Sequence, residues 1–186
     1  MTTRVGAANI YLKGDIYPVR MPTVKLPTRI RYGSRAMVDL ALRRSDGPVP
    51  LETLARRQGI PRRYLAKIIQ DLRRSGLIRS VRGAGGGYGL GRAPADVSML
   101  DIWEALEGEF WPTECLADPS CCEMLPDCVT RDVWARLREE FVAVLGAVTL
   151  ADLARRHSRK KGRSARETAR PAGGGKRPPG RRGQGG

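Results

Sequence analysis

Residues 77–90 of this chain read LIRSVRGAGGGYGL and decide its fold. Apolar and polar residues alternate on both sides of a run of glycines, which is typical of two short strands joined by a tight turn. The sequence therefore predicts a β-hairpin here.

The segment before this hairpin predicts two helices joined by a short turn. Apolar residues recur at helical spacing from Leu51, and Gly59 ends that helix at a position where a left-handed conformation is needed. Pro61 lies in the first turn of the next helix, which runs to about Ser75 with one apolar face. Two helices so connected form a helix-turn-helix, and the hairpin that follows is its wing.

Further helices are predicted on either side of this unit. An amphipathic helix extends from Thr28 to about Arg44, and the pair Ser98 and Asp101 is typical of a helix N-terminus. A longer helix begins near Thr130. Its apolar face consists of Val133, Leu137, Phe141, Val144 and Val148, with Trp134 expected to pack beneath the loop that precedes the helix. Because so apolar a helix at the end of a small domain needs a partner surface, we predict that it pairs with a second copy of the chain.

These elements divide the chain into four parts and predict a mainly α fold with a small β-hairpin wing. Residues 24–95 form a winged helix-turn-helix domain, and residues 96–157 hold a cysteine loop and the dimerisation helices. Residues 1–23 and 158–186 are predicted to be disordered, because neither shows the apolar period that orders an element.

Charge and composition restrict the function classes. The net charge is +15, and most of it lies in the Lys- and Arg-rich C-terminal tail, which favours either a polyanion partner or a solubilising role. No stretch approaches the ~18 consecutive apolar residues of a membrane helix, so we predict a cytoplasmic protein without a membrane partner. In that reducing compartment, four clustered cysteines favour a metal or redox site over a disulfide framework.

The helix after Pro61 carries cationic and aromatic residues near its N-terminal end, namely Arg62, Arg63, Tyr64 and Lys67. This is the end of a recognition helix that contacts base edges; Arg fits guanine, and Lys suits phosphates. A solvated basic face is the alternative for an isolated helix, but the adjacent wing favours double-stranded DNA.

The glycine turn adds a second predicted DNA contact. Arg82 stands just before the glycines, where a hairpin tip would carry it toward a narrow minor groove. Gly83 and Gly87 allow the backbone to approach phosphates closely. A nucleotide-binding loop is the alternative reading, but the Lys-Ser/Thr of a P-loop and a βαβ unit are both missing.

The cysteine loop predicts a metal or redox centre. Cys115, Cys121 and Cys128 are spaced Cys-x5-Cys-x6-Cys, with Cys122 beside the second, in a proline-containing stretch. Such a loop can fold three thiolates around one centre, and the helix that starts after Cys128 favours its thiolate. An iron-sulfur cluster, a zinc or thiol-redox site and a loop without a ligand all remain open at this point.

These residues resemble a known family, the winged-helix regulators typified by IscR, NsrR and RirA. The likeness covers about residues 24–157. The strings that carry it are Ile30-Arg31-Tyr32-Gly33, Gly47-Pro48-Val49-Pro50-Leu51, Arg57-Gln58-Gly59-Ile60, Ser80-Val81-Arg82-Gly83 and Gly85-Gly86-Gly87-Tyr88. The resemblance implies a homodimer, crossed through its long helix, on a palindromic operator. It also implies that Arg82 enters the minor groove and that Tyr64 and its neighbours meet the major groove.

The resemblance further implies that Cys115, Cys121 and Cys128 bind an iron-sulfur cluster, of the two-iron or four-iron type, whose state sets DNA affinity. The family's usual fourth ligands are missing: Arg131 occupies one position and Arg31 the other, and Arg stays protonated. The remaining candidates are Cys122, a nearby carboxylate or a solvent molecule.

We therefore expect a dimeric repressor or dual regulator that responds through its cluster. The alternative is a cluster-free winged-helix protein that senses thiol redox state or zinc, or that acts by binding a metabolic enzyme. An enzyme is not expected, because the single His is at position 157 and no nucleophile has a general base nearby in sequence.

Overall fold

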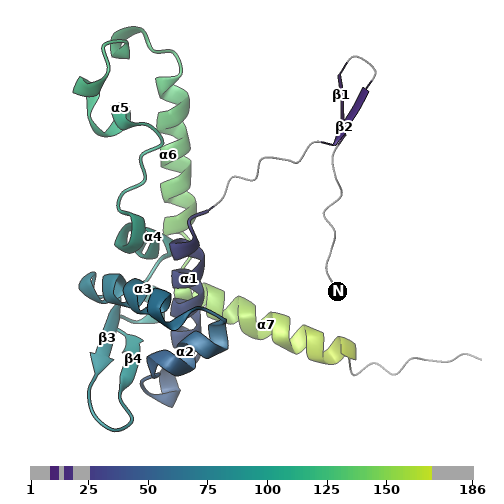
Figure 1. The fold of residues 1–186 in the computed structure, drawn as a ribbon, viewed down its shortest axis with the longest axis vertical. Coiled ribbons are helices and arrows are strands. Elements are labelled where there is room, and N and C mark those ends of the chain that lie inside the picture. The colour runs from purple at the N-terminus through teal and green to yellow at the C-terminus, as the bar shows by residue number, and fades with distance from the viewer. Residues whose placement is uncertain (1–8, 13–14, 19–25, 169–186) are drawn as a thin grey trace, which may run out of the picture.

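A helical unit and a β-hairpin form the lower part of the molecule (Figure 1). The structure is a computed structural model that describes residues 9–12, 15–18 and 26–168. The unit consists of α1 (Thr28–Leu42), α2 (Leu51–Gln58) and α3 (Arg62–Arg74), and the hairpin of β3 (Ile78–Val81) and β4 (Gly87–Leu90) follows. This order confirms the predicted mainly α fold with a hairpin wing.

The turn between α2 and α3 is fixed by the residues that predicted it. Gly59 adopts a left-handed conformation (φ 61°, ψ 39°), and its N–H donates to the carbonyls of Ala55 and Arg56. Pro61 stands immediately before α3, where its missing N–H breaks no helical hydrogen bond. The two helices therefore meet at a defined angle, which sets the direction of α3.

The wing is attached to the turn that precedes α2. β3 and β4 pair antiparallel with Val81 opposite Gly87, and Tyr88 forms an isolated bridge with Val49. The Val49 N–H donates to the Tyr88 carbonyl at 2.9 Å, and the Tyr88 N–H donates back at 2.8 Å. A Cβ at Gly87 would lie 2.4 Å from the Val49 backbone, so only glycine fits this approach. The wing and α2 are thus held together.

The C-terminal half differs from the single long helix that the sequence predicted. After α4 (Met99–Glu107), α6 runs over Arg131–Gly146, and a separate helix, α7, covers Leu150–Thr168. Val148 therefore lies outside α6. The chain turns there because Thr149 and Asp152 form a capping box that starts a new helix. The predicted capping pair of α4, Ser98 and Asp101, is present.

Both predicted disordered segments contain secondary structure. α7 continues through residues 158–168, since Arg, Lys and Ala are good helix formers and cations suit a helix C-terminus. Near the N-terminus β1 (Asn9–Leu12) pairs antiparallel with β2 (Asp15–Pro18). Both strands contain Ile and Tyr, which favour strands. The rest of 1–23 and residues 169–186 lie outside the described residues.

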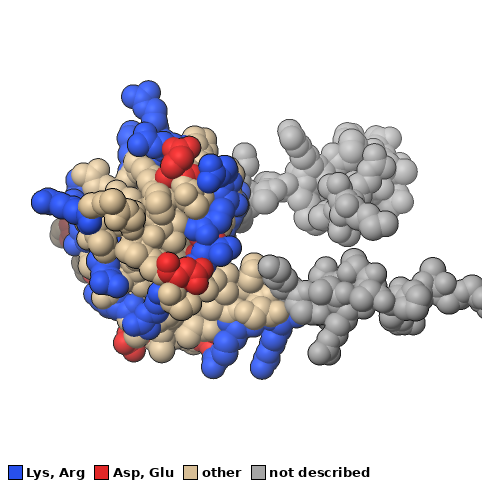
Figure 2. Space-filling model, turned by 90° about the horizontal axis from the view of Figure 1, so that it is seen from below, with Lys and Arg blue, Asp and Glu red and all other residues tan. Residues whose placement is uncertain are grey.

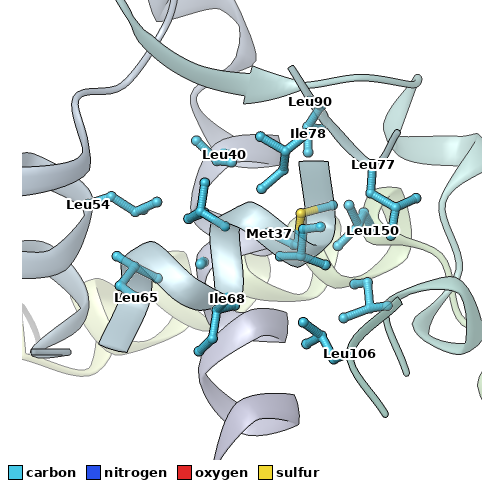
Figure 3. Packing of buried hydrophobic residues seen from close by; sticks show 14 of the residues in the cluster. Met37, Leu40, Leu54, Leu65, Ile68, Leu77, Ile78, Leu90, Leu106 and Leu150 are labelled. Carbon is cyan, nitrogen blue, oxygen red and sulfur yellow. The ribbon is translucent and has the colours of Figure 1, made fainter. Parts of the chain in front are cut away.

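One hydrophobic core joins the reading unit, which consists of α1, α2, α3 and the wing, to the C-terminal helices (Figure 3). Met37 of α1, Leu65 of α3 and Leu150 of α7 are all fully buried in it. Gly33 lets α4 approach α1, because a Cβ there would lie 2.5 Å from the Leu106 side chain. The short elements are η1 (Arg44–Asp46), η2 (Pro94–Asp96), α5 (Glu114–Ala117), η3 (Pro119–Cys121) and η4 (Leu125–Asp127). Among the described helices, none has the length and apolarity needed to cross a bilayer.

Candidate nucleic-acid interface and cysteine loop

The N-terminal end of α3 presents the cationic residues that the sequence predicted. Arg62, Arg63 and Lys67 are all exposed there. The Arg62 Nε lies 3.1 Å from the Glu52 Oε2 of α2, and both side chains are about two-thirds exposed (65% and 66%). In the part of the chain that the structure describes, Arg63 and Lys67 have no acidic partner. Their charges are available to an external anion.

Tyr64 has a structural role that the sequence did not predict. It is half-buried, and its ring packs edge-on against Tyr32 of α1 with centroids 5.9 Å apart. Arg63, Tyr64 and Lys67 also line an open groove with Tyr32. Packing on Tyr32 limits the movement of Tyr64 and fixes the side of α3 that faces this groove. Tyr32 is therefore a supporting residue that the sequence argument did not single out.

The wing tip is shaped by its glycines and carries an exposed Arg82. Gly83 has φ 99°, a conformation that other residues rarely adopt. The Gly86 N–H donates to the Gly83 carbonyl at 2.9 Å and closes the turn. Gly87 packs against the Val49 backbone, as described above, and its approach to phosphates stays a prediction. Viewed from below, the molecule shows many Lys and Arg side chains and few acidic ones (Figure 2).

The cysteine loop connects α4 to α6 and lies at the far end of α6 from the wing (Figure 1). Cys115 is in α5, Cys121 ends η3, and Cys128 precedes α6. All four cysteines are free, and none is fully buried. Within residues 26–168, however, no group of His, Cys, Asp or Glu side chains is close enough together to hold a metal ion. The four cysteines thus share one loop, but their side chains do not surround a common point.

The start of α6 favours the Cys128 thiolate, as the sequence predicted. The Thr130 hydroxyl lies 3.4 Å from the Cys128 Sγ and lowers the pKa of this thiol. The backbone N–H groups of Thr130 and Arg131 and the charge of Arg131 lower it further. Arg131, which cannot coordinate a metal, thus acts on the neighbouring thiol through its charge.

The Cys121 thiol differs from the Cys128 thiol, because its pKa is raised rather than lowered. Desolvation raises the pKa of its thiol, and the negative charges that Cys115 and Asp118 can carry raise it further. Cys122 contributes in the same direction. The loop therefore holds one thiol with a raised pKa, Cys121, and one with a lowered pKa, Cys128.

Comparison with known proteins assigns the chain to a family. The family profile described as "Rrf2: Iron-dependent Transcriptional regulator" matches residues 26–156. The chain belongs to the Rrf2 family. Its Rrf2 membership makes it a helix-turn-helix transcriptional regulator rather than an enzyme.

The relatives of this chain include one protein compared by sequence and two solved structures, and the structures share its winged helix-turn-helix Rrf2 fold. "Protein rrf2" of Nitratidesulfovibrio vulgaris is 41% identical over 71% of this chain and 88% of its own length. The structure of CymR, "the Global Cysteine Regulator of B. subtilis", superposes with a TM-score of 0.60 at 37% identity, over 71% of this chain and 97% of that one. The T. potens IscR structure gives 0.59 at 36% identity, over 81% and 94%.

In this Rrf2 protein an aromatic cluster joins the cysteine loop to the helices below it. The Phe110 ring stacks on Phe141 of α6 with centroids 3.9 Å apart, and both contact Trp103 of α4 edge-on. The Arg138 guanidinium lies 3.9 Å from the centroid of Trp111. The expectation that Trp134 packs beneath the loop is wrong, because Trp134 is 39% exposed and Trp103 lies in the cluster instead.

Proposed function

We propose that this Rrf2 protein is a homodimeric repressor or dual regulator whose affinity for a palindromic operator is set by an iron-sulfur cluster on the cysteine loop. The observation that carries the proposal is the arrangement around α6. Its N-terminus abuts Cys128, and Phe141 further along packs on Trp103 of α4. The thiol loop and the core of the reading unit are thus connected through rigid elements.

We propose that the reading unit contacts both the major and the minor groove of duplex DNA. Arg63 and Lys67, with Arg62 and Tyr64 beside them, would meet base edges and phosphates in the major groove. Arg82 would enter the minor groove, while Gly83 and Gly87 bring the wing backbone close to phosphates. Support comes from the exposure of these cations and from the fixed attachment of the wing to the turn before α2.

The dimer is proposed to form through α6. Besides Trp134, three large apolar side chains of this helix remain exposed, namely Val133 (60%), Leu137 (45%) and Val144 (59%). They follow one another at helical spacing, so they form one stripe, which a second α6 would cover. A two-fold dimer presents two identical reading units, which explains the proposed palindromic operator.

The donor chemistry of the loop fits an iron-sulfur cluster, while its present conformation leaves the donors apart. Cys115, Cys121 and Cys128 are the proposed ligands, and Cys122 is the further candidate. The thiolates required are favoured at Cys128 by its position before α6. Because no three donors converge among the described side chains, holding a cluster requires the loop to close. A bound cluster would supply a change of charge and redox state.

The lack of convergence among the described donor side chains also supports a second candidate function. Without loop closure, the free and exposed Cys121 beside Cys115 and Cys122 favours a cluster-free member that senses thiol redox state or zinc. Action through binding of a metabolic enzyme belongs to the same cluster-free class. In each case we propose that the protein works in the cytoplasm, where the DNA is.

Anaerobic purification followed by a visible spectrum and by iron and sulfide analysis separates the candidates. A cluster gives visible absorbance with both iron and sulfide, whereas zinc or free thiols give a colourless protein. Cys128→Ala is expected to remove the absorbance while leaving the far-UV circular dichroism intact. Ser120→Ala, on the same loop, is the matched control. Unchanged absorbance in Cys128→Ala would eliminate Cys128 as a ligand.

A further inference from the structure

A polar cavity of about 260 Å³ lies at the base of the wing. Its walls come from β3 and β4, from η1 at the end of α1 and from the segment that follows β4. Three arginines from these separate elements line it: Arg44, Arg79 and Arg92. No acidic residue belongs to the lining. The cavity is therefore a concentration of positive charge outside the residues assigned to DNA reading above.

The charges of this cavity are largely uncompensated. Arg92 has one acidic neighbour, since its Nη1 lies 3.6 Å from the Asp101 Oδ1. Among the ion pairs of residues 26–168, neither Arg44 nor Arg79 takes part. Guanidinium groups gathered without counter-charges repel one another, and a bound anion relieves that repulsion. The planar fork of Arg suits the oxygens of a phosphate, which two guanidiniums can share.

The strand register holds Arg79 at the cavity. Arg79 is paired across the hairpin with Gly89, which has no side chain. A Cβ at Gly89 would lie 3.8 Å from the Arg79 Nε, so the Arg79 side chain extends over this glycine. Arg79 lines the same cavity as Arg44 and Gly47. The residues meet in space although η1 and β3 are far apart in the sequence.

We infer that this cavity is a phosphate-binding site, occupied by a backbone phosphate of DNA beside the groove that the wing enters. The inference rests on the proposed DNA-binding function. Val81 lines the cavity, and the next residue is Arg82 at the wing tip. A phosphate held by Arg44 and Arg79 would fix how far the wing advances over the duplex. Such contacts position a protein on DNA without reading its sequence.

The test measures the salt dependence of DNA binding by the full chain. Fluorescence anisotropy over a KCl series would compare the parent protein with Arg44→Ala, Arg79→Ala and the double variant. Two duplexes are used: one enriched from a random library by the parent protein, and one of random sequence. Each substitution is expected to reduce the slope of log K against log salt by about 1, equally on both duplexes. Arg136→Ala, an exposed charge on α6, is expected to leave the slope unchanged.

A second arm, without DNA, separates a backbone phosphate from free phosphate. Thermal unfolding of each protein is followed in sodium phosphate and in sodium chloride at equal ionic strength. If phosphate raises the midpoint of the parent but not of the double variant, while the DNA slopes stay unchanged, the site takes free phosphate. If neither slope nor midpoint depends on Arg44 and Arg79, the phosphate site is refuted.

The two proposals fail in different ways. Absence of any duplex binding by the parent would end the proposed DNA-binding function, and the phosphate arm would still decide whether the cavity binds the anion. Selective duplex binding with slopes that do not respond to Arg44 or Arg79, and no phosphate effect, would end only the cavity proposal. Far-UV circular dichroism and gel filtration establish that each variant keeps its fold and size.

Discussion

Ser98 and Thr149 form an isolated antiparallel bridge that joins the starts of α4 and α7. Backbone hydrogen bonds from Met99 to Val148 (2.8 Å) and from Leu150 to Val97 (2.9 Å) flank it. Each bridge residue also caps its own helix, Ser98 with Asp101 and Thr149 with Asp152. The segment that carries the cysteines therefore leaves α4 and returns through α6 to the point where α4 began.

The cap of α7 predicts an acid-dependent contribution to stability. The Thr149 hydroxyl and N–H, with Arg155, lower the pKa of Asp152 to about 2 from an ordinary value of 3.8. A carboxylate with a depressed pKa stabilises the fold fully above about pH 4, and this stabilisation is lost as pH falls through about 2. Asp152→Asn should therefore lower the unfolding midpoint at neutral pH. Thermal unfolding from pH 7 to pH 2 should show the two proteins converging in acid; a constant difference would contradict this origin.

The close contact between Gly87 and the Val49 backbone predicts that a larger residue at position 87 destabilises the fold. Gly87→Ala would push a methyl group into the Val49 backbone, so we expect a loss of about 1–3 kcal/mol in unfolding free energy. Gly89→Ala is the matched control on the same strand, because its Cβ meets only an ordinary contact. Urea denaturation of both variants measures the difference. Equal effects at the two positions would show that Val49 does not impose this limit.

Arg82 is expected to dominate the contribution of the wing to DNA binding. Arg82→Ala removes the exposed guanidinium at the hairpin tip, and we expect affinity for a selected duplex to fall by about 1–3 kcal/mol. Affinity for random duplex should fall less, since minor-groove shape is part of what Arg reads. A gel-shift titration with competitor DNA gives both values. If the variant kept the selectivity and affinity of its parent, the wing would have no role.

The exposed stripe of α6 predicts the oligomeric state. Leu137→Glu places a charge in the middle of the proposed interface, so the mass measured by light scattering should shift from dimer to monomer. Arg136→Glu introduces the same side chain at the adjacent exposed position and should leave the dimer intact. If both variants stayed dimeric, another surface would have to join the two copies.

The cationic helix α7 and the tail after it should add salt dependence without sequence preference. Beyond His157, Arg159 and Lys160 are exposed on α7, and further basic residues follow in the sequence. A chain that stops after His157 should bind selected and random duplexes with equally shallower salt slopes. An unchanged slope would show that this segment does not reach the DNA.

Local signals predicted the reading unit well. Gly59, Pro61 and the capping pair Ser98–Asp101 each fix a helix end through their own backbone or side chain, so short sequence windows contain the information. The glycine run likewise specified the hairpin. The break between α6 and α7 was missed because the apolar period continues through Val148, although Thr149 and Asp152 form a capping box there and a bridge joins Thr149 to Ser98.

The candidate site was predictable only in part, because convergence of distant residues is a property of the folded chain. The loop and its four cysteines were evident from the sequence, yet it did not show that their side chains fail to converge within the described residues. The same holds for the contact of Tyr32 with Tyr64 and for the shared cavity that Arg44 and Arg79 line. No periodicity connects such pairs.

The contact of Tyr88 and Gly87 with Val49 has a consequence for the shape of the DNA that the protein would bind. Because this contact joins the hairpin to the turn before α2, it holds the spacing between the α3 and wing residues that we propose to enter the two grooves. If that proposal holds, a duplex whose groove spacing differs from this spacing must itself bend or twist to be bound. Flexible base-pair steps would then be selected at positions that no side chain touches.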